Sequence, residues 1–136
     1  MTVYTITING GNNSAGDDKV NITGTSSTIS ADTNIFGAGA FDNIEALDLT
    51  GATFGSTAGN DNDFEYLITG SLINSWTKND LTGGSLKLTL DAEAATRFEF
   101  TNSTGTKYGG DDSDTTAITS GTYTLDNGTE VIISGL

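Results

Sequence analysis

Hydrophobic and polar side chains alternate with a period of two residues along most of this chain. The alternation is clearest in residues 4–8, 20–22, 64–68, 86–90 and 98–100. Because successive side chains of a β-strand point to opposite faces of a sheet, this pattern predicts short strands with one buried face each. The chain has 18 glycines and no proline, which favours tight turns between these strands.

A hairpin is predicted near the carboxyl end, where Asn127-Gly128 separates two apolar runs at residues 123–125 and 131–133. Asn-Gly favours the two-residue type I′ turn, in which both central residues take positive φ. Two short helical turns are expected as well. One covers residues 71–76 with Ser71 as its cap, and the other covers residues 91–96 behind Asp91.

These elements indicate an all-β fold class. The pattern fits best a β-sandwich of short antiparallel strands with at most one or two short helical turns, and a short β-solenoid or β-roll is the alternative. The length of 136 residues and the lack of any break in composition indicate one domain that covers residues 1–136.

The chain is strongly acidic, with 18 acidic and 5 basic residues and a formal net charge of −13. This balance excludes nucleic acid as a partner, because few cationic side chains are there to displace the counterions of phosphates. Cysteine and histidine are both absent, which removes disulfides, thiolate sites and the usual acid–base and zinc chemistry. The glutamates are scattered and form no catalytic constellation, so we expect no enzyme; without a long apolar run we expect no membrane insertion.

Three glycine-containing stretches carry clustered oxygen donors, at residues 16–18, 59–63 and 109–114. Calcium takes about 6–8 oxygen ligands, and glycine lets a tight turn offer its carbonyls beside carboxylates. Asp-x-Asp spacing in the second and third stretches brings two carboxylates together on a bend, which is unfavourable unless a cation lies between them. The alternative is that all three are ordinary solvated turns. The predicted Ca²⁺ ligands are Asp17, Asp18, Asn60, Asp61, Asp63, Asp111, Asp112 and Asp114.

Bound calcium would also reduce the self-repulsion of the chain. Three Ca²⁺ ions, at two charges each, would bring the net charge from −13 to about −7. Since the native state alone assembles such sites, the free energy of ion binding would contribute directly to folding. We therefore expect Ca²⁺ to be the cofactor and the domain to be stabilised by it.

Two segments resemble a known family. Gly16-Asp17-Asp18-Lys19-Val20 resembles half of the glycine-rich nonapeptide repeat of RTX proteins, and residues 40–51 resemble a strand segment of large type I-secreted RTX adhesins. The leucine-rich strands and the hairpin that begins at residue 121 are similar to modules of the same proteins, so the resemblance covers residues 16–136. It implies an extracellular, calcium-dependent β-rich module of a bacterial adhesin, S-layer or similar surface protein, which folds after export from the low-calcium cytosol.

Two aromatic residues are candidates for ligand contact. Tyr108 lies beside the third acidic stretch, and Trp76, the only tryptophan, is either a stacking platform or a core residue. A calcium ion next to an aromatic ring can hold sugar hydroxyls or a peptide, which makes a Ca²⁺-dependent carbohydrate- or peptide-binding module the second functional hypothesis. The third is self-association into a lattice or fibre through unpaired edge strands at the termini.

Overall fold

The structure is a computed structural model that describes residues 8–9, 18–23, 40–52, 66–77, 84–110 and 112–136. Two helices occur in these residues, α1 (Gly70–Trp76) and α2 (Ala92–Ala95). The strands are β1 (Ile8–Asn9), β2 (Lys19–Thr23), β3 (Phe41–Asp42), β4 (Ala46–Gly51), β5 (Tyr66–Leu67), β6 (Ser85–Thr89), β7 (Phe98–Thr101), β8 (Lys107–Gly109), β9 (Gly121–Thr124) and β10 (Glu130–Ser134). The expectation of a mostly-β chain with two short helices is confirmed for this part of the chain.

The strands form a five-stranded sheet in the order β2-β4-β6-β10-β9, a three-stranded sheet in the order β5-β7-β8, and the pair β1-β3. Strands β2, β4, β6 and β10 run parallel, as do β1 with β3 and β5 with β7. Only β9-β10 and β7-β8 are antiparallel among the described pairs. The prediction of antiparallel pairing is therefore wrong for most pairs, because consecutive strands alternate between sheets and return to the same sheet in the same direction.

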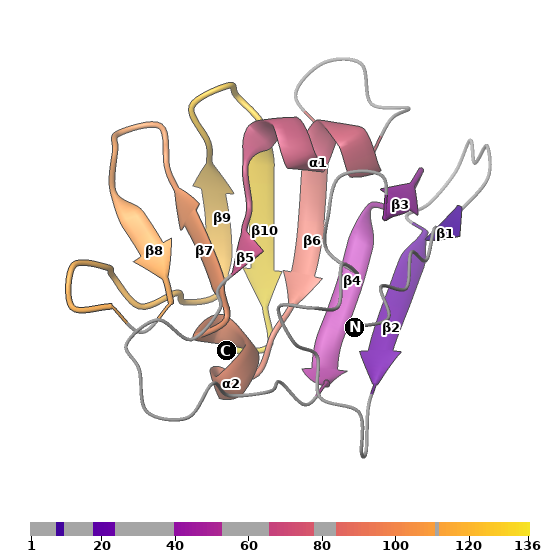
Figure 1. Cartoon of the computed structure of the whole chain (residues 1–136), viewed down its shortest axis with the longest axis horizontal. Coiled ribbons are helices and arrows are strands. Elements are labelled where there is room, and N and C mark those ends of the chain that lie inside the picture. The colour runs from indigo at the N-terminus through magenta and orange to yellow at the C-terminus, as the bar shows by residue number, and fades with distance from the viewer. Residues whose placement is uncertain (1–7, 10–17, 24–39, 53–65, 78–83, 111) are drawn as a thin grey trace, which may run out of the picture.

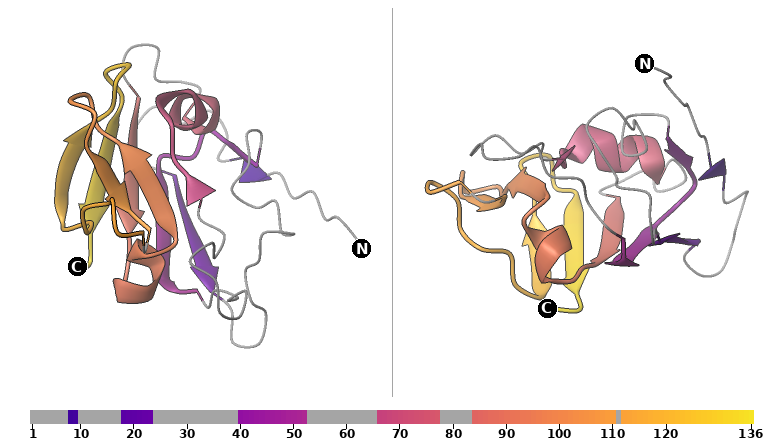
Figure 2. Two further views of the ribbon diagram at one scale, coloured as in Figure 1. Left: turned by 60° about the vertical axis from the view of Figure 1, so that its left-hand side comes forward. Right: turned by 60° about the horizontal axis from the view of Figure 1, so that its bottom comes forward.

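One face of the five-stranded sheet is covered by other elements. Figures 1 and 2 show α1, β5 and β7 on the same side of this sheet, with α2 near the lower end of the view in Figure 1. Side chains from both larger sheets and both helices meet there in one hydrophobic core. Its largest fully buried side chains are Trp76, Phe41, Phe98, Phe100, Leu47, Leu49, Ile68, Ile73, Leu86, Leu88, Leu90 and Leu125.

The alternating sequence pattern explains which face of the five-stranded sheet is buried. Leu47 of β4 pairs in register with Leu88 of β6, and both side chains are 0% exposed. Lys87, the residue between Leu86 and Leu88, is exposed on the opposite face. Removing either leucine would cost about 2–5 kcal/mol, which is typical of a large-to-small change in a packed core.

The predicted hairpin is present as β9-β10, but its turn differs from the predicted type I′ turn. Gly128 has φ of +80°, whereas Asn127 has no positive φ. The backbone N–H of Gly128 donates to Leu125 O at 3.0 Å, and that of Leu125 donates to Thr129 O at 2.8 Å. The loop thus has three residues, with a glycine in the left-handed region at its end, the geometry that follows a type I turn in longer hairpins.

The helix caps follow from short polar side chains. Asp91 caps α2 as expected, because its Oδ1 accepts a hydrogen bond from Ala94 N at 2.8 Å. For α1 the predicted cap, Ser71, is wrong: the helix begins at Gly70, and Thr69 Oγ1 accepts from Leu72 N at 3.1 Å. Within the described residues, neither helix has the length and apolar character needed to cross a bilayer.

Candidate functional site

The structure describes three of the eight predicted calcium ligands. These are Asp18 at the start of β2, and Asp112 and Asp114 between β8 and β9. The others, Asp17, Asn60, Asp61, Asp63 and Asp111, lie outside the described residues. The second glycine–acid stretch thus remains a sequence prediction throughout. Of the first stretch the structure describes Asp18, and of the third it describes every residue except Asp111.

The third stretch is held against β7 by its two glycines. Gly109 and Gly110 have φ of +87° and +66°, and Gly110 N donates to Phe98 O at 2.9 Å. A Cβ atom on Gly109 would collide with that same carbonyl oxygen. Glycine is therefore required at position 109 both by the positive φ and by the close approach of two backbones.

The turn that follows brings Asp114 back to β8. Thr115 Oγ1 donates to Asp112 O at 2.9 Å, and Thr116 N donates to Lys107 O, also at 2.9 Å. In this arrangement Lys107 Nζ lies 3.2 Å from Asp114 Oδ2, with 51% and 63% of the two side chains exposed. A lysine already neutralises one of the two carboxylates that the Asp-x-Asp spacing assigned to calcium.

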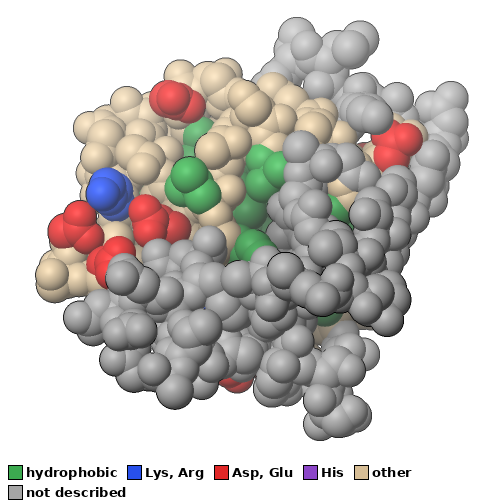
Figure 3. Space-filling model, viewed as in Figure 1, with side chains coloured by type: hydrophobic (Ala, Val, Ile, Leu, Met, Phe, Trp, Pro, Cys, Tyr) green, Lys and Arg blue, Asp and Glu red, His purple; other side chains and the backbone are tan. Residues whose placement is uncertain are grey.

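Other acidic side chains surround this ion pair. The hydrogen bond and charge of Asp114 raise the pKa of Lys107, and the charges of Glu99 and Asp112 raise it further. Figure 3 shows acidic side chains gathered around a basic one at the end of the molecule where β7 and β8 lie. Three carboxylates and one ammonium leave this corner with a local excess of negative charge, which attracts a cation.

A carboxylate that was not among the predicted calcium ligands, that of Glu45, lies beside the first stretch. Asp18 N donates to Glu45 Oε2 at 2.9 Å, and Asp18 O accepts from Glu45 N and Ala46 N at 3.1 Å each. In the sequence, Glu45 is one of the scattered glutamates and lies in none of the three glycine–acid stretches. The signal that finds it is the parallel register of β2 and β4: Lys19 pairs with Ala46, so the residues that precede the two strands are neighbours.

A second ion pair lies one residue further along β2. Lys19 Nζ is 3.1 Å from Asp48 Oδ2, and only 22% of the Asp48 side chain is exposed. Asp48 Oδ1 accepts from Thr50 Oγ1 at 2.7 Å and from Thr50 N at 3.1 Å. These bonds to Thr50 lower the pKa of Asp48 most, and the hydrogen bond and charge of Lys19 lower it further.

Among the described residues no three acidic side chains are arranged as a ready metal site. Each described stretch brings together fewer acidic groups than a metal site of this kind needs. Glu45 lies beside Asp18 in the first, and Asp112 and Asp114 share one turn in the third. Calcium needs about 6–8 oxygens, so a complete shell would also require backbone carbonyls, water or the acidic residues that lie outside the described part.

The two aromatic candidates have different environments. Trp76 is 0% exposed and packs edge-to-face on Phe41 with ring centroids 5.1 Å apart. A ring with no open face cannot serve as a stacking platform, so Trp76 is a core residue. Tyr108 is half-buried, stacks on Phe100 at 5.5 Å and meets Tyr123 edge-on at 4.8 Å. Tyr108 therefore packs on two other aromatic rings and is not fully buried.

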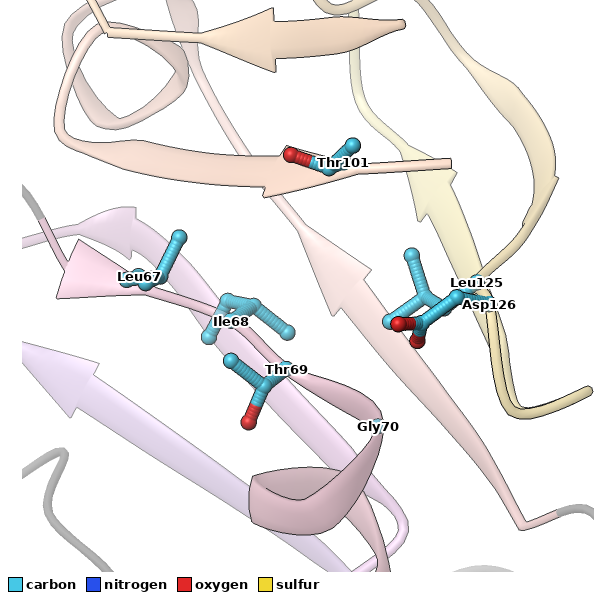
Figure 4. Close-up of a pocket in the computed structure, with 7 residues that line it drawn as sticks. All are labelled: Leu67, Ile68, Thr69, Gly70, Thr101, Leu125 and Asp126. Carbon is cyan, nitrogen blue, oxygen red and sulfur yellow. The ribbon is translucent and has the colours of Figure 1, made fainter. Parts of the chain in front are cut away.

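A small pocket lies between β5, the end of β7 and the β9-β10 turn. In Figure 4, Ile68 and Thr69 line one side, Leu125 and Asp126 the other, and Thr101 the end of β7. Its volume of about 150 Å³ is below the roughly 300–1,000 Å³ of ordinary ligand pockets. It has room for a few water molecules and gives no reason to assign a ligand there.

Comparison with protein families, with curated proteins and with solved structures finds no match for this chain.

Proposed function

We propose that this chain is an extracellular Ca²⁺-binding structural or adhesive module of a bacterial surface protein, which folds as it binds calcium. The observation that carries the proposal is the approach of the Glu45 carboxylate to the backbone of Asp18, at 2.9 Å. It adds an acidic group to a glycine–acid stretch that was predicted to bind calcium from its sequence. The resemblance to RTX surface proteins points in the same direction.

The charge of the chain supports the same conclusion. A formal charge of −13 on 136 residues destabilises any compact state through self-repulsion. Of the five basic residues in the chain, Lys19 and Lys107 are each already paired with one aspartate. The large remaining excess of carboxylates favours binding of a divalent cation.

The order of the parallel strands supports a short β-solenoid or β-roll rather than a sandwich. Strands β1 and β3 pair in one sheet, while β2 and β4, the strands that follow them, pair in another. Strands β5 and β7 repeat the relation in the three-stranded sheet. In a solenoid each turn of chain stacks on the previous one in this way, and calcium between successive turns would join them.

The test is a thermal melt followed by circular dichroism, with calcium and with excess EGTA. We expect chelation to lower the melting temperature markedly, because the ion binds the native state and not the unfolded chain. Native mass spectrometry on the same samples counts the bound ions. An unchanged melt in EGTA, with no ions bound in calcium, contradicts the proposal.

A matched pair of variants locates the first site. Glu45→Gln keeps the size of a side chain that contacts Asp18 and removes its charge, so half-maximal stabilisation should require more calcium. Glu93→Gln makes the same change at an exposed position of helix α2 and should leave the calcium dependence unaltered. Equal responses of the two variants would mean that the overall charge matters and the Asp18–Glu45 contact does not.

The incomplete burial of Tyr108 favours a second candidate, a Ca²⁺-dependent carbohydrate- or peptide-binding module. Tyr108 directly precedes the third acidic stretch in the sequence, and an exposed cation bound there would leave positions open for ligand oxygens. Binding on a glycan array or peptide library that disappears on chelation, and weakens in Tyr108→Ala, would support this version. Binding that survives chelation would exclude it.

A further inference from the structure

The β9-β10 turn contains an asparagine followed by a glycine, Asn127-Gly128. Both residues are exposed, as is Asp126 before them. The side chain of Asn127 nevertheless has fixed partners, because its Oδ1 accepts hydrogen bonds from Thr129 Oγ1 at 2.6 Å and from Thr129 N at 3.2 Å. Thr129 itself is 0% exposed, so an asparagine at the surface is held by a residue of the interior.

The same asparagine side chain packs against the first residue of α1. Gly70 is buried, and a Cβ atom at this position would collide with the amide group of Asn127. Figure 4 shows Gly70 on one side of the small pocket and Asp126, the neighbour of Asn127, on the other. The Asn127 side chain therefore connects the hairpin turn to the start of a helix.

An asparagine that precedes glycine can lose its amide group without an enzyme, because glycine leaves the next backbone nitrogen unhindered. Gly128 N attacks Cγ of Asn127: the N–Cγ bond forms, the Cγ–Nδ2 bond breaks, and the amide nitrogen leaves as ammonia with the proton of Gly128 N. Water then opens the cyclic imide. Attack at Cγ gives aspartate, and attack at the main-chain carbonyl gives isoaspartate.

The folded turn holds both reacting groups in other interactions. Gly128 N donates to Leu125 O at 3.0 Å, so the nitrogen that must lose its proton is already hydrogen-bonded. The carboxamide of Asn127 is held by Thr129, two residues further along the chain. Closing the five-membered imide ring would break these bonds and rotate the backbone of Asn127 out of the turn.

We propose that Asn127 is a deamidation site that the fold protects, so that aspartate and isoaspartate accumulate at this position while the chain is unfolded. Chemical change of the unfolded chain is one route to irreversible loss of folding. Isoaspartate adds a backbone carbon to a loop that is closed by the bond from Leu125 N to Thr129 O, at 2.8 Å. This product should therefore prevent the hairpin from forming again in its register. The inference rests on the turn alone and does not depend on calcium binding.

The experiment incubates the chain at one pH and temperature, folded in buffer and unfolded in guanidinium chloride, and follows deamidation by peptide mapping with mass spectrometry. We expect Asn127 to react at least about tenfold more slowly in the folded chain, because its hydrogen bonds must open first. In the denaturant, Asn127 should react about as fast as Asn9, which also precedes a glycine. Equal rates at Asn127 in both samples, or no reaction there in the denaturant, overturn the proposal.

Variants at position 129 test whether the hydroxyl protects the asparagine. Thr129→Val keeps the shape of the side chain and removes the donor to Asn127 Oδ1, so the folded chain should react about fivefold faster, the factor for one hydrogen bond. Thr129→Ser keeps the donor and should keep the protection. Both variants should react at the native rate in the denaturant. A folded Thr129→Val chain that reacts no faster than the native chain shows that this hydroxyl does not protect the amide, and the proposal is wrong.

A second asparagine provides a matched control. Asn102 Oδ1 accepts from Thr104 Oγ1 at 2.8 Å and from Thr104 N at 3.0 Å, the same arrangement as at Asn127, but the residue after Asn102 is serine. Thr104→Val should leave the rate at Asn127 unchanged. An acceleration equal to that in Thr129→Val would show that general loosening of the fold, and not the bond at Asn127, controls the reaction.

Refolding tests the consequence of the modification. Chains aged in the denaturant are returned to folding buffer, and the folded fraction is separated by size-exclusion chromatography. We expect this fraction to be depleted of isoaspartate at position 127. Asn127→Asp reproduces the other product, keeps an acceptor for Thr129, and should refold. Equal isoaspartate contents in the folded and unfolded fractions contradict the predicted effect on the hairpin.

Discussion

A lysine pairs with an aspartate close to the first glycine–acid stretch and another does so at the third, but in different surroundings. The Lys19–Asp48 distance of 3.1 Å and the Lys107–Asp114 distance of 3.2 Å are almost equal. Asp48 is 22% exposed and is also bound by Thr50, whereas Asp114 is 63% exposed. The Lys19–Asp48 pair is therefore part of a sheet, whereas the Lys107–Asp114 pair lies largely in solvent.

The comparison shows which groups fix the side chains and the backbone at each of the two stretches. Near the first stretch, carboxylates are fixed by backbone N–H groups and a threonine hydroxyl, so their positions are set by the sheet. In the third stretch, the backbone is fixed by Gly109 and Gly110 against β7, and the Asp114 side chain is 63% exposed. We expect side-chain changes to matter most at the first stretch and backbone changes to matter most at the third.

The largest effect is expected from Gly109→Ala. Its φ of +87° is unfavourable for alanine, and the new Cβ would collide with Phe98 O. We expect a loss of about 3 kcal/mol in the free energy of unfolding. Gly105→Ala is the control, because Gly105 has φ of +88° and open space around it, and it should cost about 1 kcal/mol. Urea denaturation measures both, and equal losses would show that the contact with β7 contributes nothing.

A smaller effect is expected from Glu45→Ala. This change removes the carboxylate that accepts a hydrogen bond from Asp18 N at 2.9 Å, and it leaves that half-buried donor without this partner. The expected cost is about 1.5 kcal/mol, within the range for hydrogen bonds to charged groups. In calcium-free buffer, Asp114→Ala, which removes an exposed partner of Lys107, should leave the urea midpoint unchanged. A larger loss from Asp114→Ala than from Glu45→Ala would reverse the comparison.

Much of the fold could be predicted from the sequence, because strand position and buried face are local properties. The run Leu86-Lys87-Leu88 gives β6 and its buried face from alternation alone. The direction of pairing could not be predicted in this way, because it depends on which strands return to the same sheet. The hairpin at Asn127-Gly128 was located correctly, but its turn type depends on how many residues separate the last paired positions.

The candidate site was predictable only where neighbours in sequence remain neighbours in space. Asp112 and Asp114 do share a turn, as their spacing indicated. Glu45 lies 27 positions from Asp18 and becomes its neighbour only through the register of two parallel strands. Trp76 could not be assigned to core or surface from composition, because a lone aromatic residue is used in both settings; its burial follows from the packing of α1 against β3.

A pH-dependent difference is expected at Asp48. Its folded-state pKa lies below the ordinary value of 3.8, so the stability it contributes is present above pH 3.8 and is lost as pH falls through the folded pKa. Asp48→Asn removes this dependence but keeps an acceptor for Thr50, as Asn102 does for Thr104. The variant should thus lose less stability than the native chain on acidification through this range, measured by chemical denaturation at each pH. Parallel pH profiles would show that Asp48 does not titrate differently in the folded state.

The smallest effect is expected at Lys107, where the readout is a pKa and not stability. Asp114 raises the pKa of Lys107, so Asp114→Asn should lower it towards 10.5, and Glu99 and Asp112 should keep it somewhat above that value. Calcium bound at the third stretch would act in the same direction, because the ion would take Asp114 from the lysine and add positive charge nearby. An NMR titration of the lysine side chains, with and without calcium, therefore reports occupancy of this stretch directly. A Lys107 pKa that calcium leaves unchanged, in a chain that chelation still destabilises, would locate the stabilising ions elsewhere and leave Asp114 as a partner of lysine alone.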